Sequence, residues 1–335
     1  MQSPCVDSRL PIVQNQGRSI DAIVISVGGN AESGRFGLAA DANNSRSSAF
    51  IDNFINMPEL PEVETMRRGI LGIVGARIDG VERVACRRKP IAIAPRIDRW
   101  RRRVVGQTVR DVGRAGKRVV VRLDSADAIV LEPRMTGLVL VADPPSREHL
   151  RFRCRLSASG IRELLYWDRR GLGNVRLFSP AEFDLAFGPA KLGPDALSIT
   201  AESYRERLGG SRRAVKVALL DQRAVAGIGN LYASEILHLA HIHPAKRCDR
   251  LTRAEWQRLA DATHAILEAA IRYEGSTLGD GTYRNALNQA GGYQSHHRVY
   301  DRAGETCRRC GGNRQIKRIV QAQRSTFYCP GCQRN

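Results

Sequence analysis

Residues 307–332 read CRRCGGNRQIKRIVQAQRSTFYCPGC, and this stretch decides how the C-terminal end of the chain folds. It contains two Cys-x-x-Cys pairs, Cys307/Cys310 and Cys329/Cys332, separated by 18 residues. Each pair presents two thiolates on one side of a turn, and two such turns complete a tetrahedral four-sulfur site for one Zn²⁺. Because four protein ligands leave no open position, this zinc is expected to be structural. A pair of disulfides or a redox-active dithiol is the alternative.

The residues between the two cysteine pairs are predicted to form a β-hairpin. GGN at 311–313 consists of typical turn residues, and the run QIKRIVQAQRSTFY (315–328) follows it. Lys317, Arg318 and Arg324 place positive charge on this hairpin, so it can reach phosphates or a nucleic-acid groove.

The charge balance of the whole chain favours a polyanionic partner. The 335 residues include 53 Lys and Arg against 34 Asp and Glu, a formal net charge of +19. Nucleic acid is the first candidate, and a ribosome-associated or membrane-surface protein is the alternative. No run approaches the roughly 18–20 apolar residues that span a bilayer, which favours a cytoplasmic protein. Four further cysteines are scattered, as expected of reduced thiols: Cys5, Cys86, Cys154 and Cys248.

The secondary-structure patterns change along the chain. Residues 1–56 carry four Arg and five Asp or Glu without sustained periodicity, and are expected to be disordered or to lie upstream of a true start at Met57. A helical pattern occupies 58–75, and helices return at 200–274, where Thr252 and Glu255 form a capping box. Short β-branched runs between them predict an antiparallel sandwich: TVRDV (108–112), RVVVRL (118–123), AIVLE (128–132), LVLVAD (138–143), LRFRCRL (150–156) and ELLYW (163–167).

The stretch MPELPEVET (57–65) places Pro58 directly after Met57. Removal of the Met would leave a free secondary amine, and an α-amine has a reference pKa near 8, against roughly 10.4 for lysine. Such an amine is partly neutral and nucleophilic near pH 7, with Glu59 beside it as an acid or base. A proline-rich helix cap is the purely structural alternative.

A second motif is AGIGNLYASE (226–235), in which two glycines precede Asn230 at a helix start. This arrangement turns backbone N–H groups toward an anion such as phosphate. The cationic segment SRRAVK, which ends at Lys216, strengthens that interpretation. A tight turn between packed helices is the alternative.

Three separated motifs resemble formamidopyrimidine-DNA glycosylases. MPELPEVETMRRG (57–69) resembles their N-terminus, AGIGNLYASEILHLAHIHP (226–244) their helix–two-turns–helix element, and QAQRSTFYCPGCQ (321–333) the second half of their zinc finger. The resemblance covers nearly all of residues 57–335, in the family's order. It implies a bacterial base-excision DNA repair enzyme, a bifunctional DNA glycosylase and AP lyase that removes oxidised purines such as 8-oxoguanine and formamidopyrimidines.

The expected fold is α+β and multidomain: an N-terminal antiparallel β-sandwich with a flanking helix, then a helix–two-turns–helix bundle and a β-hairpin zinc finger. The predicted segments are a non-native or disordered extension (1–57), the catalytic sandwich (58–190), the helical DNA-binding domain (200–275), an irregular, mobile lesion-recognition loop (276–298) and the zinc hairpin (299–335). One structural Zn²⁺ and no organic cofactor are expected. The expected partner is double-stranded damaged DNA and not a membrane, for a monomer that is cytoplasmic and nucleoid-associated.

The resemblance also implies roles for individual residues. Pro58 would attack C1′ of a flipped-out nucleoside to form a Schiff base, after which β,δ-elimination cuts the strand. Glu59 would donate a proton to the sugar, and Lys117 would contact phosphate and assist the lyase step. The DNA contacts expected are His149, Arg170, Lys216, Asn230 and Arg324.

One segment departs from the family pattern. Family members fill the space left by the flipped base with a Met and an Arg-Phe pair, and Met135 supplies the Met. The usual RRFG segment reads DRRGLG at 168–173, with Leu172 in the Phe position, Gly171 in the Arg position and Arg170 one residue earlier. Leu172 can wedge between bases or pack in a core. The preference for cytosine opposite the lesion is therefore left open.

Two alternatives accompany this interpretation. The related endonuclease VIII-like branch prefers oxidised pyrimidines, but its usual opening has Gly in place of Leu60 and Ile in place of Val63. A non-catalytic, zinc-stabilised DNA-binding protein would result if residues 1–56 are retained. The nitrogen of Pro58 would then be a tertiary amide, which cannot form an imine.

Overall fold

The computed structural model describes residues 57–311 and 314–334. All of them belong to one compact unit, Ser45–Asn335. The predictions made for residues 1–56, and for Gly312 and Asn313 of the expected turn, lie outside the described residues.

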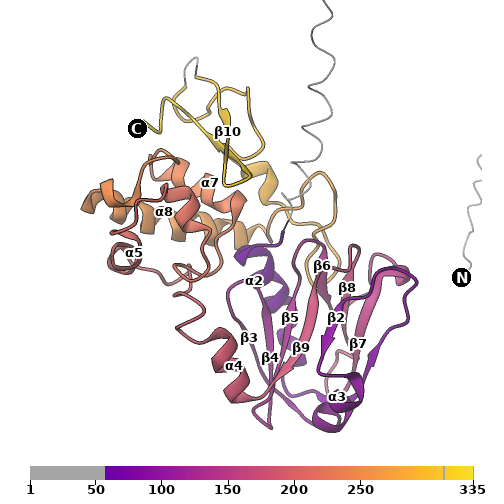
Figure 1. Ribbon diagram of the computed structural model, residues 1–335. Helices are drawn as coiled ribbons and strands as arrows, with labels where there is room; N and C mark the ends of the chain where they lie inside the picture. Colours follow the sequence, from indigo (N-terminus) through magenta and orange to yellow (C-terminus); the bar gives the residue numbers. More distant parts are fainter. Residues whose placement is uncertain (1–56, 312–313, 335) are drawn as a thin grey trace, which may run out of the picture. The chain divides into compact units, whose positions relative to one another are not determined.

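Two β-sheets pack face to face in the first part of this unit (Figure 1). Their strand orders are β1-β7-β8-β6 and β2-β9-β5-β4-β3. The strands are β1 Arg77–Arg83, β2 Ala92–Ala94, β3 Val109–Arg114, β4 Val119–Leu123, β5 Ala128–Glu132, β6 Gly137–Leu140, β7 Leu150–Ser157, β8 Glu163–Asp168 and β9 Asn174–Phe178. The predicted sandwich is confirmed, and the one parallel pair within its two sheets is β2–β9.

The core of the sandwich explains why these runs form strands. Phe152 from the first sheet and Val121 and Leu131 from the second belong to one buried cluster. Helix α3 (Ile97–Val104) packs on β1 and places Trp100 edge-on against Phe152, with ring centroids 5.2 Å apart. Helix α4 (Pro180–Phe187) follows β9 and forms a small aromatic cluster with it. Burial of apolar surface on this scale is the main stabilising contribution to such a sandwich.

Helix α2 (Leu60–Gly69) joins the sandwich to the helical part. It realises the helical pattern expected over 58–75, continued by a 3₁₀ turn at Leu71–Ile73. Leu60 belongs to the helical core, whereas Val63 and Met66 belong to the sandwich core. The residues just before α2 are therefore held where the two cores meet.

An ion-pair network reinforces this junction. Arg114 donates to the Glu64 carboxylate on α2 at 3.2 Å and makes a two-pronged contact with Asp195, at 2.7 and 2.9 Å. Arg114 is mostly buried, so this geometry holds α2 and the chain leading into the helical part against β3.

The helical part consists of α5 (Ala201–Leu208), α6 (Val215–Leu219), α7 (Asn230–Leu239) and α8 (Arg253–Arg272), with a 3₁₀ turn at Cys248–Arg250. The predicted capping box is confirmed: the Thr252 hydroxyl accepts from the backbone N–H of Glu255, and the Glu255 carboxylate accepts from that of Thr252. Leu251, the residue before this N-cap, packs against the helical core.

The zinc-finger hairpin consists of β10 (Lys317–Gln321) and β11 (Arg324–Tyr328). Its tight turn lies at Ala322 and Gln323, which have φ of 46° and 60°. Two consecutive positive φ values are typical of a type I′ hairpin turn, which usually contains Gly or Asn. The sequence therefore did not reveal this turn, although it predicted the hairpin.

Residues 275–298 contain no strand or α-helix and only a 3₁₀ turn at Tyr293–His296, as the glycine content predicts. They are nevertheless well hydrogen-bonded: the Thr277 hydroxyl donates to the carbonyl of Tyr283 at 2.8 Å, and the Asn285 side chain accepts from Leu287 and Gln289. Within residues 57–311 and 314–334, no helix is long and apolar enough to cross a membrane.

Candidate active site

The carboxylate of Glu59 lies at the N-terminal end of helix α7. It accepts hydrogen bonds from the backbone N–H groups of Gly229 at 2.6 Å and Leu231 at 2.9 Å. Glu59 is only 4% exposed. Burial raises its pKa from 4.5 to about 7, opposed by the positive charge of Lys117 and by the two amides. Glu59 can therefore carry a proton near neutral pH, which a general acid requires.

A second buried carboxylate supports Glu59 from behind. Glu62 accepts from the backbone N–H of Glu59 at 3.0 Å, from the Tyr232 hydroxyl at 2.5 Å and from the N–H of Ser276 at 2.9 Å. Burial raises the pKa of Glu62, although these hydrogen bonds favour its ionised form. Glu62 thus joins three segments: the start of α2, helix α7 and the loop that begins at 275.

The side chains of Lys117 and Glu59 both lie close to the backbone of Gly229. Lys117 lies in the turn between β3 and β4. A Cβ atom on Gly229 would lie 2.3 Å from the Glu59 carboxyl carbon and 2.6 Å from Lys117 Nζ. Any side chain at position 229 would therefore displace one of the two groups. Burial lowers the pKa of Lys117, while the charges of Glu59 and Glu62 raise it.

Pro58 is buried and lines a narrow pocket together with Glu59 and Met135. The irregular loop also lines this pocket, through Ser276, Leu278, Asp280, Thr282 and Tyr283. The structure thus brings together Pro58, Glu59 and Met135 at one pocket, and Lys117 lies near the Glu59 carboxylate, outside the lining of that pocket. A proline, a carboxyl group and a cation lie within one small region.

A polar cluster links the N-terminal end of α7 to the zinc hairpin. Lys216 donates to the side-chain carbonyl of Asn230 at 2.5 Å, and the Asn230 amide donates to the carbonyl of Ser325 at 3.1 Å. Lys216 is fully buried, and burial followed by the charge of Arg324 lowers its pKa to about 8. Arg324 itself is exposed. Three of the predicted phosphate contacts therefore lie close together: Lys216, Asn230 and Arg324. Lys216 is itself buried, and its ammonium group is bound to the side chain of Asn230.

The DRRGLG segment is organised by Asp168, which is fully buried. Its carboxylate accepts from the Thr136 hydroxyl at 2.5 Å and from the backbone N–H groups of Arg170 at 3.1 Å and Gly173 at 2.7 Å. Because Thr136 follows Met135, Asp168 fixes the two predicted base-replacing segments relative to each other.

Gly171 of this segment stands where the family pattern has Arg. Its φ is +63°, and a Cβ atom there would lie 2.3 Å from the carbonyl oxygen of Lys89. The backbone therefore leaves no room for a side chain at 171. Arg170 is exposed and Leu172 is half-buried beside it. Arg169 pairs with Asp280 of the irregular loop at 3.7 Å.

His149 lies apart from the pocket residues. Its ring packs edge-on against Trp167, with centroids 5.5 Å apart. Its Nε2 lies 3.9 Å from the Glu148 carboxylate. The structure places His149 on the sandwich, at the start of β7.

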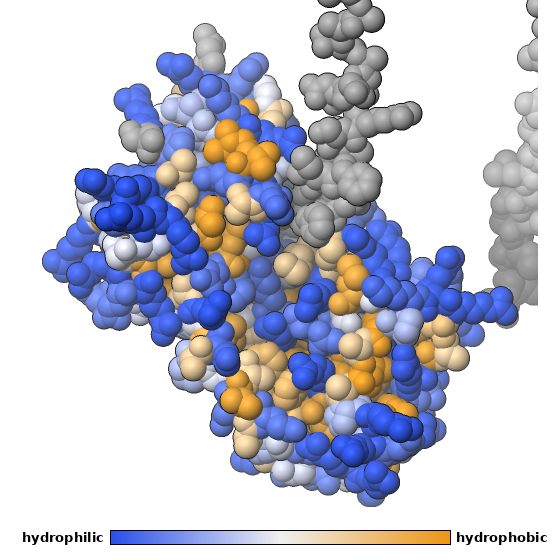
Figure 2. Space-filling model, in the orientation of Figure 1, coloured by the Kyte–Doolittle hydropathy of each residue, from blue (hydrophilic) through white to orange (hydrophobic). Residues whose placement is uncertain are grey.

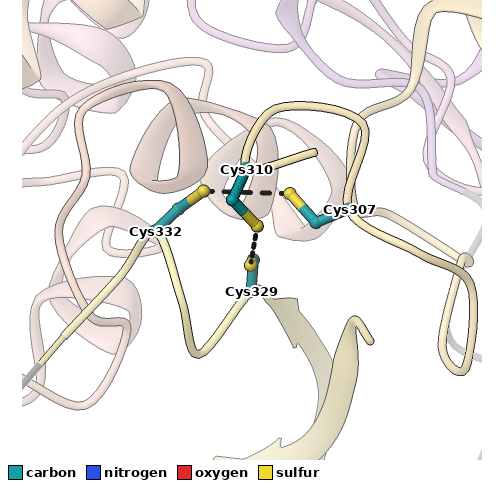
Figure 3. Close-up of side chains that lie close together, drawn as sticks. All are labelled: Cys307, Cys310, Cys329 and Cys332. Carbon is teal, nitrogen blue, oxygen red and sulfur yellow. Dashed lines mark hydrogen bonds between the residues drawn. The ribbon is translucent and has the colours of Figure 1, made fainter. Parts of the chain in front are cut away.

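The four predicted zinc ligands come together (Figure 3). The sulfur atoms of Cys307, Cys310, Cys329 and Cys332 all lie within 4.8 Å of one another. Two of the sulfur pairs are 3.6 and 3.8 Å apart, close to the roughly 3.8 Å edge of a tetrahedron with Zn–S bonds of about 2.3 Å. All four thiols are free, so the disulfide alternative is wrong. The donor set fits one structural Zn²⁺, which would hold the hairpin against the helices.

Sequence reasoning missed three contributors to this region: Glu62, Tyr232 and Asp168. Glu62 had one available signal, because it lies three residues after Glu59, the spacing at which a side chain reaches back to a helix-start N–H. The contacts of Tyr232 and Asp168 join residues 170 and 32 positions apart, and no local pattern encodes them.

Comparison with known proteins agrees with this geometry. Family models match at residues 57–175 (formamidopyrimidine-DNA glycosylase N-terminal domain), 192–281 (the H2TH domain of the same family) and 304–335 (zinc finger found in FPG and IleRS). The formamidopyrimidine-DNA glycosylase of Chloroflexus aurantiacus is 38% identical over 281 residues, covering 83% of this chain and 98% of the relative. That of Rhodopseudomonas palustris is 37% identical over 308 residues, covering 83% and 100%.

Comparison with solved structures indicates the same family. Lactococcus lactis Fpg in complex with DNA that contains an abasic site is similar, with a TM-score of 0.72 and 32% identity over 83% of this chain and 100% of that one. MutM in complex with DNA containing carbocyclic 8-oxo-G has a TM-score of 0.71 and 31% identity, with the same coverage. The chain therefore belongs to the formamidopyrimidine-DNA glycosylase family of base-excision repair enzymes.

Proposed function

We propose that this protein is a bifunctional DNA glycosylase and AP lyase that excises oxidised purines through a Schiff base on Pro58. The observation that carries the proposal is the juxtaposition of Pro58 and Glu59 at one pocket, with the pKa of Glu59 at about 7 and Lys117 near its carboxylate. Each of these groups would have a task in imine chemistry at C1′.

The first step uses the lone pair of a Pro58 amine. The amine attacks C1′ and the bond from C1′ to the base breaks. The base leaves with the electron pair of that bond and takes up the proton that the Pro58 nitrogen loses. Glu59, protonated near neutral pH, donates a proton to the sugar ring oxygen as the ring opens to the imine. Loss of a proton from C2′ then expels the 3′ phosphate, and a second elimination expels the 5′ phosphate. No oxidant or reductant is needed.

This chemistry requires a free amine at Pro58. In a chain that retains residue 57, the Pro58 nitrogen is an amide and cannot attack. We infer that the active form begins at Pro58, after a start at Met57 and removal of that Met. The N-terminal-domain match begins at residue 57, which supports this inference.

Double-stranded damaged DNA is the proposed substrate, and we propose that the protein binds it in the nucleoid. Asn230 at the start of α7, Arg324 on the hairpin and Lys117 would grip phosphates on either side of the flipped nucleotide. Lys216 would act by orienting Asn230. Figure 2 shows a largely hydrophilic face over the helices and the hairpin, as a phosphate-binding surface requires. His149 and Arg170 are the proposed contacts from the sandwich side.

Met135 and Leu172 would occupy the space that the flipped base leaves. Asp168 holds their two segments together, so they would enter the duplex as one unit. Leu172 is smaller than Phe and has no aromatic ring, so its stacking on the opposite base would be weaker. We expect weaker discrimination for cytosine opposite the lesion than a Phe would give, and Leu172→Phe should increase it.

The test uses two proteins, one that begins at Pro58 and one that retains residues 1–57. Each is incubated with duplexes that carry 8-oxoguanine, a formamidopyrimidine, thymine glycol or an abasic site, and the cut strands are resolved by length. The proposal predicts cleavage of the two purine lesions and of the abasic site with phosphate at both ends of the gap, by the Pro58 protein alone. Preference for thymine glycol would indicate the endonuclease VIII-like alternative, and tight binding without cleavage by either protein the non-catalytic one.

A further inference from the structure

The residues of the two Cys-x-x-Cys pairs and their neighbours contact the C-terminal end of helix α7. Arg309 donates to the carbonyl of Leu239 at 3.1 Å, His241 Nδ1 lies 3.1 Å from the carbonyl of Cys332, and the Gln333 amide donates to the carbonyl of Ile242 at 2.9 Å. A further contact reaches the sulfur atom of a zinc ligand. His238 Nε2 lies 3.5 Å from Cys307 Sγ.

Both residues of this contact, His238 and Cys307, are buried. His238 is 1% exposed and Cys307 is fully buried. A zinc-bound thiolate carries negative charge and needs hydrogen-bond donors, and water cannot supply one to a buried sulfur. The backbone N–H groups of Arg309 and Cys310 donate to Cys307, and those of Gly331 and Cys332 donate in the same way to Cys329. Cys307 has the His238 ring in addition.

The surroundings of the ring decide which nitrogen carries the proton. His238 Nδ1 is buried without a hydrogen-bond partner among the described residues. A proton on Nδ1 would leave a buried donor unpaired, at a cost of about 1–3 kcal/mol, whereas a proton on Nε2 points at sulfur. A neutral ring with Nε2–H is therefore the favoured tautomer.

We propose that His238 donates its Nε2–H to the Cys307 thiolate and thereby slows the release of the structural zinc. His238 is then a positioning residue for the metal, acting through Cys307 rather than as a ligand. Partners of this kind behind a ligand typically contribute 10- to 100-fold to metal affinity. The inference rests on the four-cysteine zinc site and is independent of the chemistry proposed for Pro58.

The test compares zinc release from four proteins: the wild type, His238→Leu, His238→Gln and His264→Leu. Leu keeps the apolar bulk but cannot donate, and Gln keeps a side-chain N–H. His264 is a control histidine on α8 that also has a ring nitrogen with no hydrogen-bond partner in the described part of the chain. Each zinc-loaded protein is mixed with a chromogenic chelator, and the first-order rate of zinc transfer is measured.

His238→Leu should release zinc about 10-fold faster or more, His238→Gln should recover part of the difference, and His264→Leu should match the wild type. Equal rates for His238→Leu and the wild type would overturn the proposal, as would equal acceleration by Leu and Gln. Nitrogen NMR of ¹⁵N-histidine-labelled wild type gives a second readout that needs no variant. Protonation of Nε2 supports the assignment, and protonation of Nδ1 contradicts it.

Discussion

Two buried carboxylates are bound up with helix α7: Glu59 at its N-terminal end and Glu235 within it. Both accept hydrogen bonds from backbone N–H groups, and burial raises the pKa of both. Glu59 accepts from amides at the N-terminal end of the helix. Glu235, inside the helix, accepts from the backbone N–H groups of residues 298–300 at 2.8–2.9 Å. They are 4% and 0% exposed.

The difference between them lies in what else each carboxylate faces. Glu59 adjoins the Pro58 pocket and has Lys117 beside it, so a proton on it can be transferred. Glu235 is enclosed by the amides that lead into the zinc finger, so its role is to hold the chain. We therefore propose that the adjoining pocket and the nearby Lys117 are what allow Glu59, but not Glu235, to act as an acid.

Glu59→Gln should have the largest effect. Gln keeps one acceptor oxygen, but its NH₂ would face one of the backbone N–H groups that the carboxylate now pairs, and it cannot deliver a proton. Single-turnover base excision should therefore slow by about 10²–10⁴-fold. The melting temperature should fall by only the several degrees expected of one unpaired buried group, and the affinity for lesion DNA should stay near the wild-type value. Loss of binding in parallel with activity would mean that Glu59 is mainly structural.

The pH dependence of stability should be the next largest effect. The pKa of Glu59 is about 7 when folded and 4.5 ordinarily, so the folded state holds a proton that the unfolded state loses. This contribution is fully present below pH 4.5 and is lost as pH rises through 7, amounting to about 3 kcal/mol. Denaturant unfolding between pH 4.5 and 8 should show this decline in the wild type and a shallower one in Glu59→Gln. Identical slopes would contradict the raised pKa.

The same shift predicts a basic limb in the activity profile. Because Glu59 must be protonated, kcat/KM should fall as pH rises above about 7, whereas a Pro58 amine with a reference pKa near 8 should reduce it at lower pH. A bell-shaped profile with a maximum between these values is expected. A profile that rises steadily to pH 9 would exclude Glu59 as the acid.

Glu235→Gln should lower stability while sparing activity, whereas Glu59→Gln should lower activity far more than stability. An amide NH₂ would point at backbone N–H donors, leaving buried groups unpaired at about 1–3 kcal/mol of unfolding free energy. The melting temperature should fall by several degrees, while activity per folded molecule stays within about 2-fold of wild type. A larger loss of activity than of stability would erase the distinction between the two carboxylates.

Asn230→Ala should have the smallest effect. It removes the link between Lys216 and Ser325 and one proposed phosphate contact. The affinity for lesion DNA should weaken by about 5-fold, since one neutral hydrogen bond contributes about 1 kcal/mol. Because no charge is lost, the salt dependence of binding should be unchanged, whereas Arg324→Ala should reduce its slope by about 1. A change in slope for Asn230→Ala would point to a lost cation contact through Lys216.

Local patterns predicted the parts of this molecule that local chemistry determines. The zinc ligands follow from Cys-x-x-Cys spacing, and the start of α8 from Thr252 and Glu255, because these contacts join residues close in sequence. The strands β3 to β8 followed from β-branched runs, whereas β1, β2 and β9 were not among the predicted runs.

The rest depends on contacts between distant residues. The turn at Ala322 and Gln323 lacks the residues that usually adopt positive φ, and the parallel β2–β9 pair joins strands about 80 residues apart. Glu59 was identified as an acid from its position beside Pro58, but its raised pKa comes from burial against α7, some 170 residues later.

The central claim is that the nitrogen of Pro58 becomes covalently bound to the sugar. The most direct measurement is borohydride trapping of the protein that begins at Pro58 on an 8-oxoguanine duplex, followed by proteolysis and mass spectrometry. The account predicts a reduced sugar adduct on the peptide that begins at Pro58, and none when residue 57 is retained. An adduct on Lys117 or Lys216, or no adduct alongside full base excision, would contradict it.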